Sequence, residues 1–272
     1  VIYAHPRKIN LEGIYYSIYT DFLPETIDGS YLIIEPQRNT GEHYPSVHSE
    51  HVLYDDYILL VSKILSLFKK NNRALEIEIA SHLEELSVLL DVVLPIEELC
   101  RIGQRLYKNY LIRTKMWKKI IERIHHKAVI NVVHYQPDKM MLTEVAKFYR
   151  IPVIEMQHGT INKDHFMYNY PKIKRYPFFP DYIMLFGSFW KETASYPIDS
   201  EHLIPIGFPF IDYMRSRARK YKRLEQKGKT RLLFLSQYTI AERMIEFARD
   251  FIDICAEKNL DMDMYEIAKV LS

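Results

Sequence analysis

Hydrophobic positions in the first fifty residues come in short runs rather than at helical spacing. The runs Tyr15–Tyr19 and Tyr31–Glu35 are rich in aromatic and β-branched residues and are bounded by Asp, Pro and Gly. This pattern is typical of short strands. The next stretch, Pro36–Glu50, is polar and contains His43 and His48. We predict that it forms a surface loop.

Three helices are predicted between residues 53 and 124, where the apolar positions change to a period of three to four. The first is Leu53–Phe68, and the second is Ser81–Val92, which we expect to end before Pro95. The third, Pro95–Ile124, begins with a proline followed by two glutamates, as helix N-termini favour. The apolar faces consist of Leu53, Tyr57, Leu60, Ile64 and Phe68 in the first helix and of Ile96, Leu99, Leu106, Tyr110, Trp117, Ile120 and Ile124 in the third.

Alternating strands and helices are predicted from residue 128 onward. Ala128–Val133 is a continuous apolar run, the pattern of a strand that is buried on both faces. A polar elbow, a helix at Met140–Tyr149 and a second buried strand at Ile151–Met156 follow, which together make a βαβ unit. Such alternation predicts an α/β fold with a mostly parallel sheet. Further strands are predicted at Tyr182–Phe186, Leu203–Ile206 and Arg231–Leu235.

A domain boundary is predicted where the charged stretch Arg215–Thr230 ends in Lys227-Gly228-Lys229. It divides the chain into an N-terminal domain with its linker, residues 1–228, and the start of a second domain, residues 229–272. The second part is too short for a doubly wound domain, which takes on the order of 100 residues. We therefore expect the second domain to be truncated or to lack internal segments, and the initial Val1 indicates that an N-terminal piece is also missing.

Composition and charge exclude some classes of function. There are 37 Lys and Arg residues against 35 Asp and Glu, a formal charge of +2, which argues against a nucleic-acid partner. Cys100 and Cys255 are isolated and lack the spacing of metal ligands. We interpret them as buried free thiols in a reducing compartment. With no apolar run of membrane-spanning length and no signal peptide, a cytoplasmic protein is expected. The basic clusters Lys115–Lys119 and Arg215–Lys222 are interpreted as solvated helix faces, and contact with an anionic membrane surface is the alternative.

The tripeptide Gln157-His158-Gly159 directly follows the buried strand Ile151–Met156. In an open parallel sheet, ligands bind in the crevice beyond the carboxyl ends of the strands. A histidine at that edge suits general-base chemistry because its pKa is near neutrality. Gly159 would let a substrate approach the backbone closely. The alternative is that His158 only fastens the strand end to a neighbouring loop.

Three other junctions between strands and helices carry candidate residues. His134 follows the preceding strand and should open onto the same edge of the sheet, although such a polar segment is often just a loop. Gly207 and Pro209 mark a tight turn into a helix, whose exposed amides attract phosphate. Ser236 and Gln237 could hold a nucleotide phosphate or cap the next helix.

No metal site is predicted. His125-His126 lacks a companion cysteine or carboxylate at ligand spacing and is interpreted as a helix C-terminus. Asp261-x-Asp263 is the only Asp-x-Asp pattern in the sequence. It lies in the stretch where we expect internal residues to be missing. The sequence therefore predicts chemistry that needs neither a metal nor a resident cofactor.

Taken in order, the segments VIEMQHGTI, FPDYIMLFGSFWKE, LIPIGFPFID and RLLFLSQ resemble bacterial surface- and capsular-polysaccharide glycosyltransferases of the GT-B kind. They are also similar in motif order to the CDP-glycerol glycerophosphotransferases. The resemblance covers residues 128–237 and implies two Rossmann-like domains with mostly parallel sheets, the second incomplete here. A Lys-x-His-Pro-like element and a later acidic or Ser-Thr element of these families are absent.

The resemblance implies a role for each candidate residue. His158 would be a base or phosphate contact, with Gln157, Gly159 and His134 beside it. Gly207 and Pro209 would lie at the interdomain cleft, and Ser236 and Gln237 beside the phosphates of the donor.

From these observations we predict a metal-independent glycosyltransferase that moves a sugar from a nucleotide-sugar donor to a glycan acceptor. The acceptor could be lipid-linked, with the enzyme in peripheral contact with the inner membrane face. The alternatives are transfer of a polyol phosphate from CDP-glycerol, and a non-catalytic scaffold of a polysaccharide assembly complex. A nucleotide-sugar epimerase is less favoured, because it would need acidic acid/base partners that the sequence does not identify.

Overall fold

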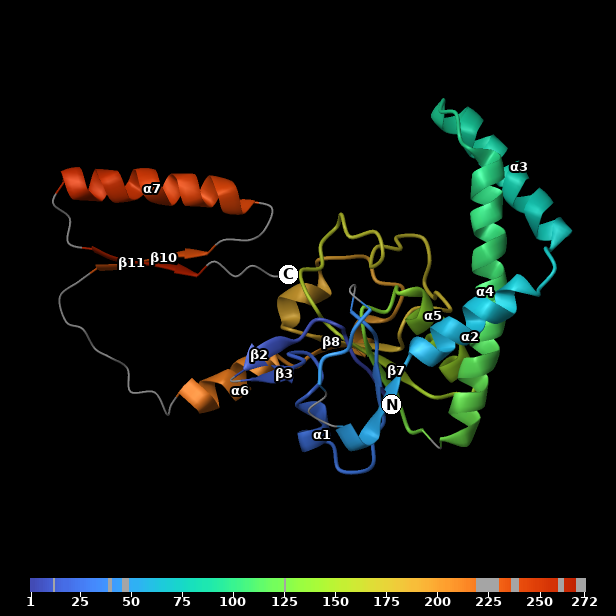
Figure 1. The fold of residues 1–272 in the computed structure, drawn as a ribbon, viewed down its shortest axis with the longest axis horizontal. Helices are drawn as coiled ribbons and strands as arrows, with labels where there is room; N and C mark the ends of the chain where they lie inside the picture. The colour runs from blue at the N-terminus through green and yellow to red at the C-terminus, as the bar shows by residue number, and fades with distance from the viewer. Residues whose placement is uncertain are drawn as a thin grey trace. The chain divides into compact units, whose positions relative to one another are not determined.

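The computed structural model describes residues 1–11, 13–38, 41–45, 49–124, 126–218, 230–235, 240–258 and 262–267. The chain divides into two compact units, Val1–Arg215 and Ser216–Ser272 (Figure 1). The boundary predicted at residues 228–229 lies outside the described residues.

The first unit is built on a seven-stranded sheet with the order β5-β4-β1-β6-β7-β8-β9, in which every neighbouring pair is parallel. Its strands are β1 (Ile2–Tyr3), β4 (Ile33–Glu35), β5 (Val52–Tyr54), β6 (Val129–Val132), β7 (Val153–Met156), β8 (Tyr182–Leu185) and β9 (Leu203–Pro205). The α/β class with a mostly parallel sheet is therefore confirmed. A separate antiparallel hairpin joins β2 (Ile9–Leu11) to β3 (Ile14–Tyr16).

One interior strand of this sheet, β1, was not predicted from the sequence. β1 has only two residues, too few to show any periodicity, and it lies between β4 and β6. The predicted strand Tyr15–Tyr19 contributes only its first two residues to β3, in the small hairpin and outside the main sheet.

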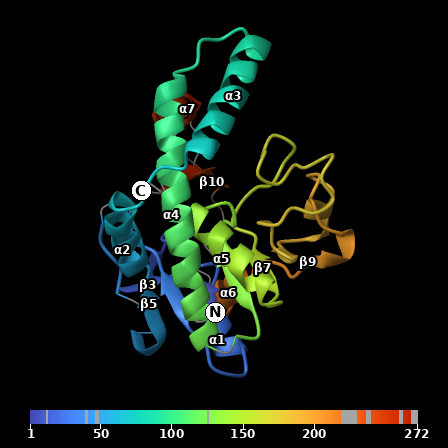
Figure 2. The same cartoon turned by 90° about the vertical axis from the view of Figure 1, so that its right-hand side faces the viewer.

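Helices cover the sheet and connect its strands. Pro137–Phe148 forms α5, whose buried side chains pack with Trp117 of α4 (Ile96–Arg123) in the main core. Figure 2 shows α4 crossing α5 and continuing beyond it, where it pairs with α3 (Arg73–Leu90). The remaining helices are α1 (Leu23–Thr26), α2 (Asp56–Leu67) and α6 (Pro209–Ala218), which begins in this unit. Single 3-10 turns lie at Ser49–His51, Ser188–Lys191 and Ser200–His202.

The predicted apolar face of the first long helix is reversed in the structure. Helix α2 begins only at Asp56, because the preceding residues form β5. It buries Ile58 and Ser62 against the rest of the unit. Its apolar stripe points to solvent and consists of Tyr57, Leu60, Ile64, Leu67 and, just after the helix, Phe68. In α4, the predicted face is correct at the fully buried Trp117 and wrong at the exposed Leu106.

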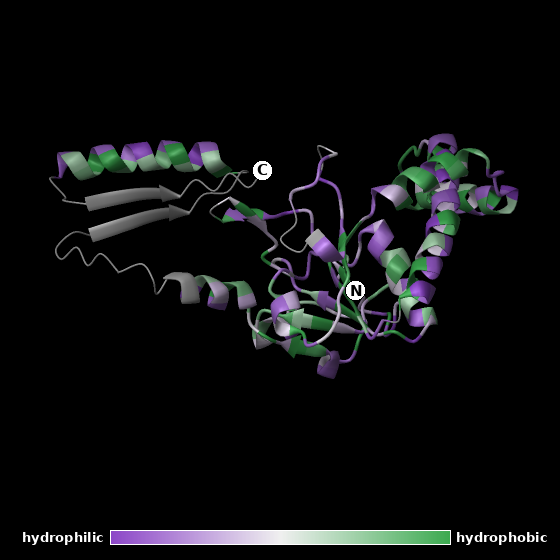
Figure 3. Ribbon diagram, turned by 60° about the horizontal axis from the view of Figure 1, so that its bottom comes forward, coloured by the Kyte–Doolittle hydropathy of each residue, from purple (hydrophilic) through white to green (hydrophobic). Residues whose placement is uncertain are grey.

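The second unit contains a parallel strand pair, β10 (Thr230–Leu235) with β11 (Met262–Ile267), joined through α7 (Ala241–Glu257). Figure 3 shows hydrophobic and hydrophilic residues alternating along α7, as expected for an amphipathic helix. β10 confirms the strand predicted at Arg231–Leu235, whereas β11 was not predicted. Asp263 pairs with Arg231 in this ladder, while Asp261 lies outside the described residues.

Candidate functional site

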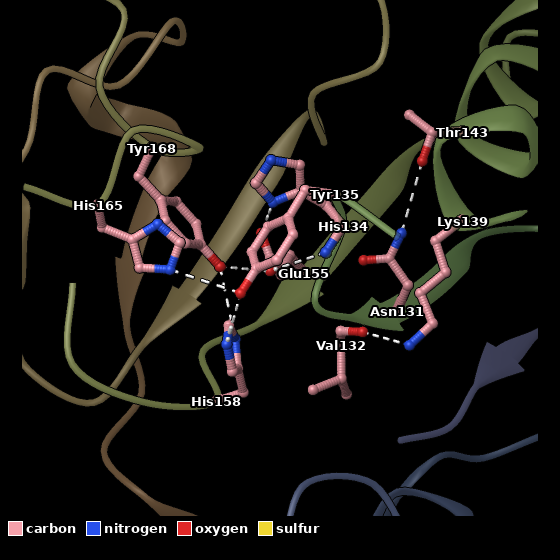
Figure 4. A network of polar contacts seen from close by, with 10 residues as sticks. All are labelled: Asn131, Val132, His134, Tyr135, Lys139, Thr143, Glu155, His158, His165 and Tyr168. Carbon is pink, nitrogen blue, oxygen red and sulfur yellow. Dashed lines mark hydrogen bonds and ion pairs between the residues drawn. The ribbon is translucent and has the colours of Figure 1, made fainter. Parts of the chain in front are cut away.

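The carboxyl ends of the neighbouring strands β6, β7 and β8 bring three of the candidate residues, His134, Gln157 and His158, to one edge of the sheet. β1 connects to β4 on one side and pairs with β6 on the other, so the topological switch point lies between β1 and β6. Open α/β sheets bind ligands beyond such a point. Figure 4 shows the polar network at this edge, which contains His134, Tyr135, Glu155, His158, His165 and Tyr168.

Glu155 is the buried carboxylate of this network. It lies in β7 and is fully excluded from solvent. Its Oε2 is 2.7 Å from Nδ1 of His134, and its Oε1 accepts from the backbone N–H of His134 at 3.1 Å and from the Tyr168 hydroxyl at 2.7 Å. Burial raises the pKa of Glu155, but His134 and these hydrogen bonds outweigh it, so the pKa is lowered overall. Glu155 is therefore an anion held by three donors.

His158 is half-buried and lies two residues beyond the end of β7. Its Nδ1 is 3.5 Å from the Tyr168 hydroxyl, and its Nε2 is 3.4 Å from the Tyr135 hydroxyl. Because the Tyr168 proton is donated to Glu155, the Tyr168 oxygen is free to accept Nδ1–H of His158. This arrangement leaves the Nε2 lone pair facing Tyr135. The main chain is also held, since the Tyr19 hydroxyl donates to the carbonyl of His158 at 2.8 Å.

Burial lowers the pKa of His158, although the charge of Glu155 opposes this effect. His158 is thus neutral near pH 7, the state in which an imidazole can take up a proton. The histidine is hydrogen-bonded to its neighbours and is still partly exposed, and its role as a general base stays a prediction.

His165 is a second histidine at the same tyrosine, and it was not among the residues predicted from the sequence. Its Nε2 lies 3.4 Å from the Tyr135 hydroxyl, the distance found for His158. Tyr135 therefore bridges the two imidazoles. His165 comes from the loop after β7. The aromatic residues that follow it up to Tyr170 are the one sequence signal that could have marked it as a site residue.

A buried lysine and a further histidine adjoin this network on the β1 side. Lys139, in the first turn of α5, donates to the backbone carbonyls of Ala4 at 3.1 Å and of Val132. Burial lowers its pKa to about 7. Burial, followed by the charges of Lys139 and His158, lowers the pKa of His5 to about 3. Lys139 thereby joins the ends of β1 and β6 at the switch point.

The structure places the residues predicted around His158 in different positions. Gln157 is buried, donating to the carbonyl of Gly159 at 2.8 Å and accepting from the N–H of Phe186 at 2.7 Å. It therefore links β7 to the end of β8. Gly159 has open space around the position that a Cβ would take. His134 is buried beneath the site, against Phe179, and contacts Glu155 rather than the open edge.

Gly207 and Pro209 lie beside the same edge. Gly207 has a φ of +79°, and Pro209 begins α6. The residue between them, Phe208, packs on Phe186 and on the ring of Tyr19, the tyrosine that binds the His158 carbonyl. Ser236 and Gln237 lie outside the described residues.

Two further properties concern only the part of the chain that the structure describes. Within it, no three His, Cys, Asp or Glu side chains gather in a way that could hold a metal ion. None of the described helices combines the length and the apolar character needed to cross a membrane.

Comparison with known proteins finds similarity only to solved structures; no family model and no curated protein matches. One similar structure is UDP-GlcNAc 2-epimerase from Neisseria meningitidis bound to UDP-GlcNAc, with 10% identity, a TM-score of 0.33, and coverage of 69% of this chain and 55% of that one. Another is UDP-N-acetylglucosamine 2-epimerase from Rickettsia bellii, with 14% identity, a TM-score of 0.32, and coverage of 60% and 45%. The chain thus spans about half the length of these epimerases.

Proposed function

We propose that this chain is a glycosyltransferase in which His158 deprotonates a hydroxyl group of a glycan acceptor. The observation that carries the proposal is the position of the neutral His158 at the carboxyl edge, with Nδ1 directed to Tyr168 and Glu155 and with Nε2 on the other side. The motif order from residue 128 to 237, similar to that of GT-B transferases, supports the choice of a nucleotide sugar as donor.

In the proposed reaction, Nε2 of His158 takes the proton of the acceptor hydroxyl as its oxygen attacks the anomeric carbon of the donor sugar. The bond from that carbon to the nucleotide phosphate oxygen breaks, and the nucleoside diphosphate leaves with the electron pair. The new imidazolium is stabilised by Glu155 through Tyr168, because the carboxylate is fixed before the charge appears. The Tyr135 hydroxyl lies 3.4 Å from Nε2 of His158 and would be displaced by the acceptor hydroxyl.

The test is a thermal-shift screen against UDP, GDP, CDP and CMP and their sugar and glycerol conjugates, followed by turnover with the ligand that binds. A ligand that binds only the folded chain raises the melting temperature. His158→Ala should lower turnover by at least about 100-fold, because a general base is lost. The rise in melting temperature caused by the nucleotide should be kept. His82→Gln is the matched control, because His82 is an exposed histidine on α3.

Each outcome separates the proposal from its alternatives. A response to CDP-glycerol alone would favour polyol-phosphate transfer, in which His158 can play the same part. If no nucleotide changes the melting temperature and His158→Ala changes no measurable property, the chain is a scaffold and the proposal is wrong.

A further inference from the structure

Several large apolar side chains of the hairpin formed by α3 and α4 are exposed. Helix α3 has 18 residues, and none of them is buried. Ile77, Val88 and Leu89 expose 64%, 84% and 78% of their surface, and Val93 in the turn exposes 99%. Large contiguous apolar surfaces on a folded protein mark sites of interaction.

The pairing of the two helices is nevertheless specific. Gln104 of α4 both donates to and accepts from the backbone of Asn72, the residue that caps α3. Gly103 lies so close to Ile79 that an added Cβ would be only 2.7 Å from its Cδ1. The two helices of the hairpin therefore pack in one defined arrangement, and the exposed leucines and valines form part of its surface.

A groove lies at the base of the hairpin, between α2, α3 and α4. Its volume is about 780 Å³, and Cys100 and Gln104 are part of its lining. Four basic residues, Lys63, Arg101, Arg105 and Lys108, line it, against two acidic ones, Glu76 and Glu97. Neither Arg105 nor Lys108 forms an ion pair with any of the described residues.

The other end of the hairpin has the opposite character. The last two turns of α3 carry Glu84 and Glu85 next to the exposed Val88, Leu89 and Leu90. This acidic, apolar tip is disfavoured on an anionic lipid surface, which attracts basic segments. The tip is complementary to the basic groove, which is also lined by apolar side chains.

We propose that the hairpins of two copies of this chain pack antiparallel, so that the tip of each enters the groove of the other. One surface carries both complementary parts, as an interface with two-fold symmetry requires. In this orientation Glu84 and Glu85 face Arg105 and Lys108 of the second copy. In the parallel orientation the two acidic tips would lie together, and like charges disfavour that arrangement.

The proposal is tested on the full chain by analytical ultracentrifugation at protein concentrations up to about 100 μM. The wild type should form a dimer. Glu84→Lys with Glu85→Lys should weaken dimerisation by about tenfold or more, and Arg105→Glu with Lys108→Glu should do the same. Combining all four substitutions should restore dimerisation to within a few-fold of the wild type, because the charges are exchanged rather than removed.

Two further variants keep the outcome independent of folding. Leu89→Asp should abolish the dimer without lowering the melting temperature of the monomer, because this side chain is exposed. Ile58→Asp, at a buried position of α2, is the contrasting variant that should unfold the chain. A monomeric wild type, or a fourfold variant that stays monomeric, would overturn the proposal. So would binding to phosphatidylglycerol vesicles that Leu89→Asp abolishes, since the tip would then be a membrane contact.

Discussion

At the scale of single residues, the site depends on which proton each side chain holds. Glu155 is an anion, while burial, followed by the influence of Glu155, raises the pKa values of Tyr168 and Tyr135, so both hydroxyls keep their protons. Tyr168 therefore donates to Glu155, and His158 is left as the group able to change its charge near neutral pH.

Replacing Tyr168 with Phe should lower turnover by about 10- to 100-fold. The substitution removes the acceptor of Nδ1–H, so the imidazolium of His158 is less stable and its pKa falls further. Activity needs neutral His158 and is lost as the pH falls through that pKa. The acidic limb of the pH–rate profile should therefore move to lower pH in the variant. Tyr170→Phe, whose ring packs on Tyr176 and Phe179, is the control; an equal loss there would argue for a structural effect.

Lys139 is expected to make stability depend on pH in a specific window. Its pKa is lowered from 10.5 to about 7, so between these values the unfolded chain binds a proton that the folded chain does not. Its contribution to stability should therefore rise from pH 7 to pH 10, by up to about 4 kcal/mol. Urea unfolding of the wild type and of Lys139→Met at pH 7 and pH 10 measures this difference. An effect of the substitution that is the same at both pH values would contradict the lowered pKa of the buried Lys139.

At the scale of elements, the orientation of α2 is the largest departure from the sequence analysis. The apolar stripe with helical spacing is real, but it is on the exposed side, while the buried side includes a serine. Ser62 is tolerated there because its hydroxyl donates to the Leu59 carbonyl and accepts from Arg113.

Two isoleucines of α2 give a matched test of this orientation. Ile58→Ala should lower the free energy of unfolding by about 2–5 kcal/mol, because it opens a cavity in the core. Ile64→Ala, the same change on the exposed stripe, should cost less than about 0.5 kcal/mol. Denaturant unfolding of both variants measures the difference. The reverse order would show that α2 presents its other face to the core.

Two glycines at the site should respond differently to alanine. Gly207 has a positive φ, so Gly207→Ala should cost about 1–2 kcal/mol of stability even though space is available for the methyl group. Gly159→Ala should leave the melting temperature unchanged, because no atom beyond the adjoining residues lies within 4 Å of the added Cβ. If acceptor binds above Gly159, turnover of this variant should nevertheless fall. Melting curves and turnover of both variants distinguish the two effects.

At the scale of the whole molecule, the seven-stranded sheet and the described site residues belong to residues 1–215. A fragment of these residues contains a complete core around Trp117 and should fold cooperatively by itself. Its circular dichroism melt should show one sharp transition. A broad, non-cooperative melt would show that the sheet needs the second unit for stability. Retained nucleotide binding by the fragment would contradict the proposed place of the donor beside Ser236 and Gln237.

The α/β class and the place of His158 after a buried strand could be predicted from the sequence, because runs such as Val129–Val132 are local signals of buried strands. It also placed Gly207 at the turn into α6. Other features depended on contacts between distant residues. The two-residue strand β1 is defined by its partners β4 and β6, and the outward face of α2 is defined by what the rest of the unit covers.

The network around His158 belongs to this second group. Glu155 looks like one polar residue in a hydrophobic strand, and Tyr168 and His165 look like loop residues. His134 and Glu155 are 21 positions apart in the sequence, and only the pairing of parallel strands brings His134 Nδ1 within 2.7 Å of Glu155 Oε2. The spacing of hydrophobic residues and the composition indicate whether a residue tends to be buried. The partner that stabilises a buried charge depends on which distant residues the tertiary structure brings beside it.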